Sequence, residues 1–322
     1  MAGGGDGHES GGAILAAFLA NMGIAVTKFV GFVITGSSSL LAESIHSVAD
    51  SSNQGLLFLG GRQAGRAPTE LHQFGYGRVR YFWAFVVAVV LFTLGGLFSA
   101  YEGYHKIAEP HEIESPAVAI AILVVAMVME GNALRTAARH ARPQRGDRSW
   151  VRYIRETRNP ELPTLLLEDT GALLGLAFAL LGVVLALITG EPVFDGIGTL
   201  AIGVLLLCIA VVLAIEMRSL LIGEAASPDL QARIEAEFER GPGVRRVIHV
   251  LTQHLGPDEL LVAAKLEFDP SLTTQQLVEA IDAIEKSVRT TAGAGAARIY
   301  VEPDVGQRES LSEARPQPAA GH

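Results

Sequence analysis

Apolar residues gather into six runs that are each long enough to cross a membrane. Crossing about 30 Å of hydrocarbon takes roughly 20 helical residues. The six runs lie at Gly12–Ile34, Leu40–Gly61, Val79–Tyr104, Pro116–Ala138, Leu162–Thr189 and Asp195–Leu221. The second run is the least hydrophobic, because ionisable side chains interrupt it, and a window scan could miss it. The pattern predicts a membrane-embedded, all-α bundle of six helices over residues 12–222.

A different pattern follows from Gly223, where polar residues become frequent and the apolar positions are spaced for short elements. The spacing and the turn residues predict the order α-β-β-α-β, which is compatible with a ferredoxin-like α+β domain over residues 223–304. The predicted elements are Leu230–Arg240, Val247–His254, Leu260–Phe268, Thr273–Thr290 and Ala297–Glu302. Residues 1–11 and 305–322 are polar without an apolar period, so we expect both ends to be disordered.

Composition agrees with a membrane protein. Hydrophobic residues make up 49% of the chain and charged residues only 18%, whereas soluble proteins carry about 25% charged residues. A net charge of −9 does not suggest a nucleic-acid binder. The single cysteine, Cys208, excludes a disulfide framework and a cysteine-based zinc site.

Basic residues are distributed unequally among the loops that connect the predicted spans. The loops after spans one, three and five contain a single basic residue, Lys106. The loops after spans two and four are rich in arginine: Arg62, Arg66, Arg78 and Arg80 in one, and Arg135, Arg139, Arg142, Arg145, Arg148, Arg152, Arg155 and Arg158 in the other. The positive-inside rule then places both termini in the cytoplasm. We assign the eight arginines of the second loop to topology and lipid headgroups, and not to nucleic acid, because no aromatic stacking platform is recognised there.

Two clusters of ionisable side chains interrupt the apolar runs. Glu43, His46 and Asp50 lie in the second span, and Glu168 and Asp169 lie in the fifth. Ionisable groups in hydrocarbon cost roughly 2.5–3.5 kcal/mol each and are usually functional. His46 and Asp50 are one helical turn apart on one face, and an imidazole with carboxylates suits a divalent transition metal. We expect His46, Asp50 and Asp169 to converge near mid-membrane.

A purely structural role is the alternative for these clusters, in which buried polar groups only lock two helices together. A helix contact rarely needs this many acids at one depth.

Lys28, in the first span, is expected to extend along its helix toward the interface. Asp195, at the start of the sixth span, is expected to be interfacial or to cap that helix.

Several motifs together resemble the cation diffusion facilitator family, and within it the zinc transporter 9-like branch. The first is GSSSLLAESIHSVAD at Gly36–Asp50, followed by HQFGYGR at His72–Arg78. The branch is indicated by Ser44–Leu57, by Met129–Gly131 and by LEDTGALLG at Leu167–Gly175. The resemblance covers about residues 12–304.

The resemblance implies a six-span homodimer in the lipid bilayer that exports a divalent metal from the cytoplasm in exchange for protons. It implies metal ligands at His46, Asp50 and Asp169. The family usually has a histidine where this chain has Leu165, so the fourth ligand is open between Glu168, Glu130 and Glu43. Glu168 would need a rotation or a local distortion, because adjacent residues point about 100° apart on a helix. Asn53, close to Asp50, would support the site from a second shell.

Zinc is the favoured substrate, because an imidazole with carboxylates suits it. Manganese, cobalt and iron(II) are the alternatives, because the missing second histidine leaves fewer nitrogen ligands and weakens the preference for zinc. The expected location is a bacterial inner or plasma membrane. In the soluble domain, the family's metal positions map onto Ile248, Lys265 and Tyr300 or Val301, so we expect little metal affinity there.

Two other classes of function use the same residues. A membrane metalloenzyme would activate water on the bound metal, but the sequence offers no second catalytic cluster or substrate domain. A non-transporting membrane scaffold would retain the site only in degenerate form. Metal uptake into vesicles under a pH gradient separates all three classes.

Overall fold

The computed structural model describes residues 22–293 and 296–305, which belong to two compact units. The helical unit ends at Ile222 and the C-terminal unit begins at Gly223. Three predictions from the sequence fall on residues that the structure does not describe, with Val305 as the one exception. They are the disorder of 1–11 and of 305–322, and the first part of the first span, 12–21.

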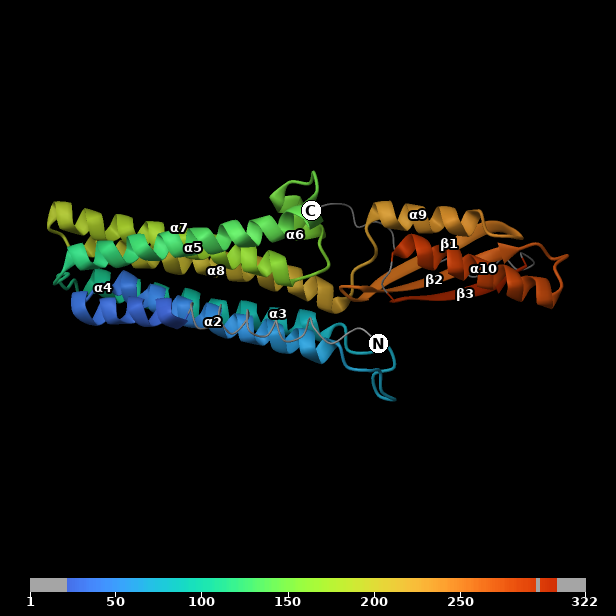
Figure 1. Ribbon diagram of the computed structural model, residues 1–322, viewed down its shortest axis with the longest axis horizontal. Coiled ribbons are helices and arrows are strands. Elements are labelled where there is room, and N and C mark those ends of the chain that lie inside the picture. The colour runs from blue at the N-terminus through green and yellow to red at the C-terminus, as the bar shows by residue number, and fades with distance from the viewer. Residues whose placement is uncertain (1–21, 294–295, 306–322) are drawn as a thin grey trace, which may run out of the picture. The chain divides into compact units, whose positions relative to one another are not determined.

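Helices occupy all six predicted spans, as far as these lie within the described residues (Figure 1). The third predicted span is continuous from Val79 to Ala108 but contains a π-helical segment, η1. The helices are Met22–Thr35, α2 (Ser38–Ala64), α3 (Val79–Val90), η1 (Leu91–Leu97), α4 (Phe98–Ala108), α5 (Pro116–Arg145), α6 (Trp150–Glu156), α7 (Glu161–Thr189) and α8 (Val193–Ile222).

Four of the helices in the described ranges are long and apolar enough to cross a membrane: Val79–Ala108, α5, α7 and α8. The part of the first predicted span that the structure describes, Met22–Thr35, is apolar but shorter than the other four. The α2 helix has sufficient length but buries many polar side chains, including Glu43, His46 and Asn53, which lower its hydropathy. The structure therefore shows a bundle of apolar helices, and the count of six spans stays a prediction.

Helix α8 packs against α3, α4 and α7 within this bundle. Its contact with α4 is close because Gly103 and Gly203 have no side chain. A Cβ atom at Gly103 would collide with the backbone of Leu200, and one at Gly203 would collide with the backbone of Ala100. The apolar core includes Leu91, Leu123, Leu176, Ile202, Leu206 and Leu213.

The first turn of α2 is anchored by Asp195 from α8. Asp195 is fully buried and accepts hydrogen bonds from the backbone nitrogen of Ser38 at 2.8 Å and from Ser37 Oγ at 2.9 Å. A carboxylate at a helix N-terminus satisfies free N–H groups and complements the helix dipole. Asp195 thus acts at a helix N-terminus, which was one of the two predicted alternatives, but the helix that it caps is α2 and not its own. The helix that carries His46 and Asp50 is fixed at its start by this contact.

The C-terminal unit consists of two helices and a three-stranded sheet among its described residues. Strands β1 and β2 are antiparallel, and α10 connects β2 to β3, which is parallel to β2. The elements are α9 (Pro228–Glu239), β1 (Val244–Gly256), β2 (Glu259–Phe268), α10 (Thr274–Ala292) and β3 (Ala296–Asp304). This is the predicted α-β-β-α-β order, and the ferredoxin-like assignment itself stays a prediction.

Side chains of the two helices and of β2 form the core of the C-terminal unit. Buried and partly exposed residues alternate along β2, which is the period expected for a strand with one covered face. Ile234 and Phe238 from α9 pack in the same cluster as Ile284 and Val288 from α10. Thr273 starts α10 with a capping box in which Gln276 bonds back to the Thr273 backbone. The unit therefore has its own core.

Candidate metal site

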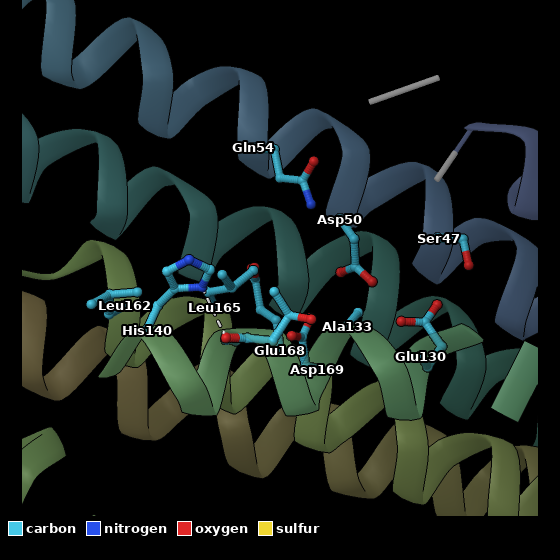
Figure 2. Close-up of a pocket in the computed structure, with 12 residues that line it drawn as sticks. Ser47, Asp50, Gln54, Glu130, Ala133, His140, Leu162, Leu165, Glu168 and Asp169 are labelled. Atoms are coloured by element: carbon cyan, nitrogen blue, oxygen red, sulfur yellow. Dashed lines mark hydrogen bonds between the residues drawn. The ribbon is translucent and has the colours of Figure 1, made fainter. Parts of the chain in front are cut away.

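A cavity of about 320 Å³ lies between α2, α5 and α7 (Figure 2). The lining positions on each helix are mostly three or four residues apart, so each helix presents a single face to the cavity. Residues from these faces line it: Ser47, Asp50, Gln54, Glu130, Ala133, Thr136, Ala137, His140, Leu162, Leu165, Glu168 and Asp169.

Four carboxylates line this cavity, and each was a candidate ligand from the sequence. Figure 2 draws Asp50, Glu168 and Asp169 between His140 at one end and Glu130 at the other. Negative charges gathered in a low-dielectric cleft repel one another and attract cations. The arrangement thus favours binding of a divalent cation over binding of an anion or a neutral molecule.

Glu168 is held in place by Asn53, which was expected to support the metal ligands without binding the metal itself. Asn53 Nδ2 donates a hydrogen bond of 2.7 Å to Glu168 Oε1, and both side chains are buried. Glu168 and Asp169 both line the cavity although they are adjacent on α7. The structure therefore brings Glu168 to the cavity wall without a break in the helix.

His46 lies beside the cavity but is not among the residues that line it. Its side chain is only 1% exposed, and Nδ1 lies 3.5 Å from Asp50 Oδ1. Among the described residues, neither ring nitrogen of His46 has a hydrogen-bond partner, and neither does Asp50 Oδ1. Buried polar atoms without a partner are costly in a fold, so a cation that both residues bind would satisfy them.

Glu43 and Glu130 belong to a cluster that already contains a cation, the ammonium of Lys28. Lys28 Nζ lies 3.0 Å from Glu43 Oε2 and 3.9 Å from Glu130 Oε1, and it donates a 2.8 Å hydrogen bond to Ser47 Oγ. Lys28 and Glu43 are both fully buried. The prediction that Lys28 extends toward the interface is therefore wrong, because the side chain turns inward to pair with Glu43.

No group of three or more His, Cys, Asp or Glu side chains is close enough to hold a metal ion anywhere in the part of the chain described. The structure brings Asp50, Glu130, Glu168 and Asp169 to one cavity and His46 to within ion-pair distance of Asp50. A complete ligand set of His46, Asp50 and Asp169 would require further convergence of α2 and α7.

Sequence reasoning missed His140, Gln54 and Ser47 as cavity residues. A signal for His140 exists on α5, because Glu130, Ala133, Ala137 and His140 repeat at three- and four-residue intervals on one helix face. The arginines on either side, Arg139 and Arg142, obscured it. The family motifs quoted above reach only Gly131 on α5, so helical spacing was the only guide to His140.

The C-terminal unit carries no comparable arrangement at the positions suggested by the resemblance. Lys265 lies across the sheet from His249 on one side and from Glu302 on the other. Its ammonium is 2.9 Å from Glu302 Oε1 and 3.4 Å from Asp304 Oδ2. The hydrogen bond to Glu302 raises the pKa of Lys265, so this amine stays protonated and does not act as a metal ligand.

Zinc titrated into a 223–305 fragment is therefore expected to give no binding heat at micromolar concentration in a calorimeter. Lys265→His is the matched positive control, because it places an imidazole opposite His249. Stoichiometric zinc binding by the unmodified fragment would contradict this assignment.

Comparison with known proteins gives one domain-level match and several similar chains. The cation efflux transmembrane domain matches residues 14–222. The chain is 33% identical over 257 residues to the human mitochondrial proton-coupled zinc antiporter SLC30A9, covering 79% of this chain and 45% of the relative. It is 26% identical over 269 residues to metal tolerance protein C4 of Arabidopsis thaliana, covering 83% and 59%.

A third relative matches along nearly its whole length. The magnetosome protein MamM of Magnetospirillum gryphiswaldense is 25% identical over 296 residues, covering 87% of this chain and 86% of the relative. By contrast, the chain spans about half the length of the antiporter relatives, at 45% of the human protein. The match to the cation efflux transmembrane domain, over residues 14–222, includes the helices that enclose the cavity.

Proposed function

We propose that this chain, a member of the cation diffusion facilitator family, transports a divalent metal cation across a membrane. Within the family it belongs to the zinc transporter 9-like branch. The family consists of transporters, so the protein is not an enzyme. Zinc is the proposed substrate and protons are the proposed counter-ions. Both proposals are supported by the name of the human relative, a proton-coupled zinc antiporter.

The cavity between α2, α5 and α7 carries this proposal. It places Asp50, Glu130, Glu168 and Asp169 on its wall, and the last three lie on α5 and α7, which are apolar enough to cross a membrane. Carboxylates in such surroundings mark ion pathways in membrane proteins. A metal bound there would compete with protons for the same oxygen atoms, which is the chemistry that exchange requires.

His46, Asp50, Asp169 and Glu168 are the proposed ligands, with Asn53 orienting Glu168. Glu43 is a weaker candidate because it is paired with Lys28, and Glu130 is close to the same ammonium. A small rotation of α2 about its axis would turn His46 toward the cavity, since His46 and Asp50 share a helix face. Such a movement would convert an open cavity into a closed ligand set.

The membrane arrangement follows from the same family and from the arginine-rich loops. The protein is an integral, multi-pass membrane protein. We propose six spans, both termini on the cytoplasmic side, residues 12–222 as the transport domain and residues 223–304 as a domain that holds a homodimer. A bacterial inner or plasma membrane is the proposed location, although the name of the human relative places that protein in mitochondria.

Metal identity is tested by uptake into vesicles that contain the purified protein and a metal-sensitive dye. Zinc is expected to enter these vesicles faster than it enters protein-free vesicles. Cobalt, manganese and iron(II) are expected to compete with zinc, and the order of their competing strength indicates whether nitrogen or oxygen ligands dominate the site. Uptake of manganese or iron(II) with exclusion of zinc would favour the alternative substrate. Absence of flux for every divalent metal would refute transport and favour a scaffold.

Glu168→Gln is expected to keep the protein folded while changing the pH profile of transport and the preference among metals. The amide retains the size of the side chain and can still bond to Asn53, but it can no longer bind and release a proton. Two neighbouring carboxylates repel each other, so loss of one alters how the pair exchanges protons for metal. The measurement is initial uptake rate against pH for zinc and manganese. Unchanged rate, selectivity and pH profile would make Glu168 a bystander.

A further inference from the structure

The imidazole that lines the cavity is that of His140 on α5, whereas His46 does not line it. We propose that His140 is a nitrogen ligand at one end of the cavity, where it receives a partly hydrated divalent cation of the zinc type before the carboxylates bind it. This inference rests on the proposed transport function and adds a binding position to the pathway.

The hydrogen bonding of His140 prepares its second nitrogen for metal. His140 Nδ1 lies 2.9 Å from the backbone oxygen of Thr136, one turn earlier on α5. A carbonyl oxygen can only accept, so Nδ1 carries the proton and donates it. The lone pair of a neutral ring is then on Nε2. Metal-binding histidines are commonly oriented in this way, with one nitrogen donating to an oxygen and the other facing the metal.

The position of His140 places it on the approach to the carboxylates. It is ten residues beyond Glu130 on α5, which is about 15 Å along a helix axis. Ala133, Thr136 and Ala137 lie between them on the same face and also line the cavity. These side chains are small, so the floor of the cavity stays open between His140 and the acids.

The same end of the cavity has apolar side chains opposite His140. Leu162 and Leu165 of α7 line the cavity there, and Figure 2 draws both next to the imidazole. Neither offers a donor atom to a cation. Among the residues that line the cavity, His140 is the one with an imidazole nitrogen, and Figure 2 draws it at this end, beyond Glu168 and Asp169. Arg139 and Arg142 neighbour His140 in sequence, but neither lines the cavity.

A single imidazole with water completing the coordination shell forms a weak site, and a weak site suits transit. A cation must bind well enough to enter and loosely enough to leave. Imidazole also discriminates among metals, because nitrogen ligands favour zinc and cobalt, whereas oxygen ligands suit manganese, magnesium and calcium. His140 would thus raise the preference for zinc in a cavity whose other charged groups are carboxylates.

The first test measures transport by the full-length protein in vesicles. His140→Ala and His140→Gln are each expected to raise the KM for zinc about 10-fold, with little change in maximal rate and in the KM for manganese. His249→Ala, which removes an exposed imidazole from the C-terminal unit, is the matched control and is expected to change nothing. Leu165→His in the His140→Ala background should lower the KM for zinc again, because it returns an imidazole to the same cavity.

The second test measures binding without transport. Diethylpyrocarbonate acylates accessible neutral imidazoles, and zinc is expected to slow the modification of His140 but not that of His249. The folded, full-length protein is modified first, and mass spectrometry of its peptides after digestion then follows each site. Failure of zinc to protect His140, or equal changes of KM for zinc and manganese in the variants, would overturn the inference. Absence of metal flux in the unmodified protein would instead refute the proposed function, and protection of His140 would still report the site.

Discussion

Asp50→Asn and Asp169→Asn are each expected to abolish metal transport. Both carboxylates line the cavity, and Asp50 Oδ1 has no hydrogen-bond partner within the described residues. Asparagine keeps the shape of the side chain but removes the negative charge that holds a cation. Loss of groups that merely orient a metal ligand costs roughly 10–100-fold. Loss of the ligand itself should therefore lower the uptake rate by about 100-fold or more.

The control for these variants is Asp282→Asn, which makes the same chemical change at an exposed position on α10. It is expected to transport at the normal rate. Size-exclusion chromatography and circular dichroism should show that all three variants are folded. If folded Asp50→Asn or Asp169→Asn retained more than half of the zinc flux, that carboxylate would not be a ligand.

Lys28→Met is expected to lower stability more than any other single change among the candidate residues. It leaves Glu43 fully buried without its cation, since Lys28 Nζ lies 3.0 Å from Glu43 Oε2. Breaking a buried ion pair by removing one partner costs about 3–5 kcal/mol. The midpoint temperature of thermal unfolding in detergent should therefore fall by about 10 °C.

The double variant Lys28→Met/Glu43→Gln separates the pair from the side chain itself. Replacement of both members of a buried pair is often close to neutral, so most of the lost stability should return. Lys286→Met, at an exposed position in the C-terminal unit, should leave the midpoint unchanged. A midpoint for Lys28→Met equal to that of the unmodified protein would show that the ion pair does not stabilise the bundle.

Local patterns predicted the helices and strands because the signals that define them are local. Apolar spacing located the long helices of the bundle within the described residues, and turn residues such as Gly256 and Pro257 separated β1 from β2. It did not locate the short helix α6, which lies in the arginine-rich stretch assigned to a loop. The apolar stretch Leu260–Phe268 predicted strand β2, and the structure shows its residues alternating between buried and partly exposed. These features depend on neighbours a few residues apart, which a single sequence displays directly.

Contacts between distant helices were not predictable in the same way. Asp195 caps α2 from 157 positions away, and Asn53 reaches Glu168 across 115 positions. Helical periodicity assigns a side chain to a face of its own helix, but it does not say which neighbour that face meets. For this reason Lys28 was expected at the interface, although it pairs with Glu43. His46 was expected to converge with Asp50 and Asp169, and the structure places its Nδ1 3.5 Å from Asp50 Oδ1 but not on the cavity wall.

The most direct test of the central claim is zinc uptake into protein-containing vesicles across an imposed pH gradient. If zinc exchanges for protons, a vesicle lumen that is more acidic than the medium should drive zinc into the lumen above its external concentration. Each zinc ion that enters should release protons into the external medium and acidify it. Asp169→Asn vesicles should show neither effect. Zinc flux that ignores the pH gradient would contradict proton exchange, and flux equal to that of Asp169→Asn vesicles would contradict transport through this cavity.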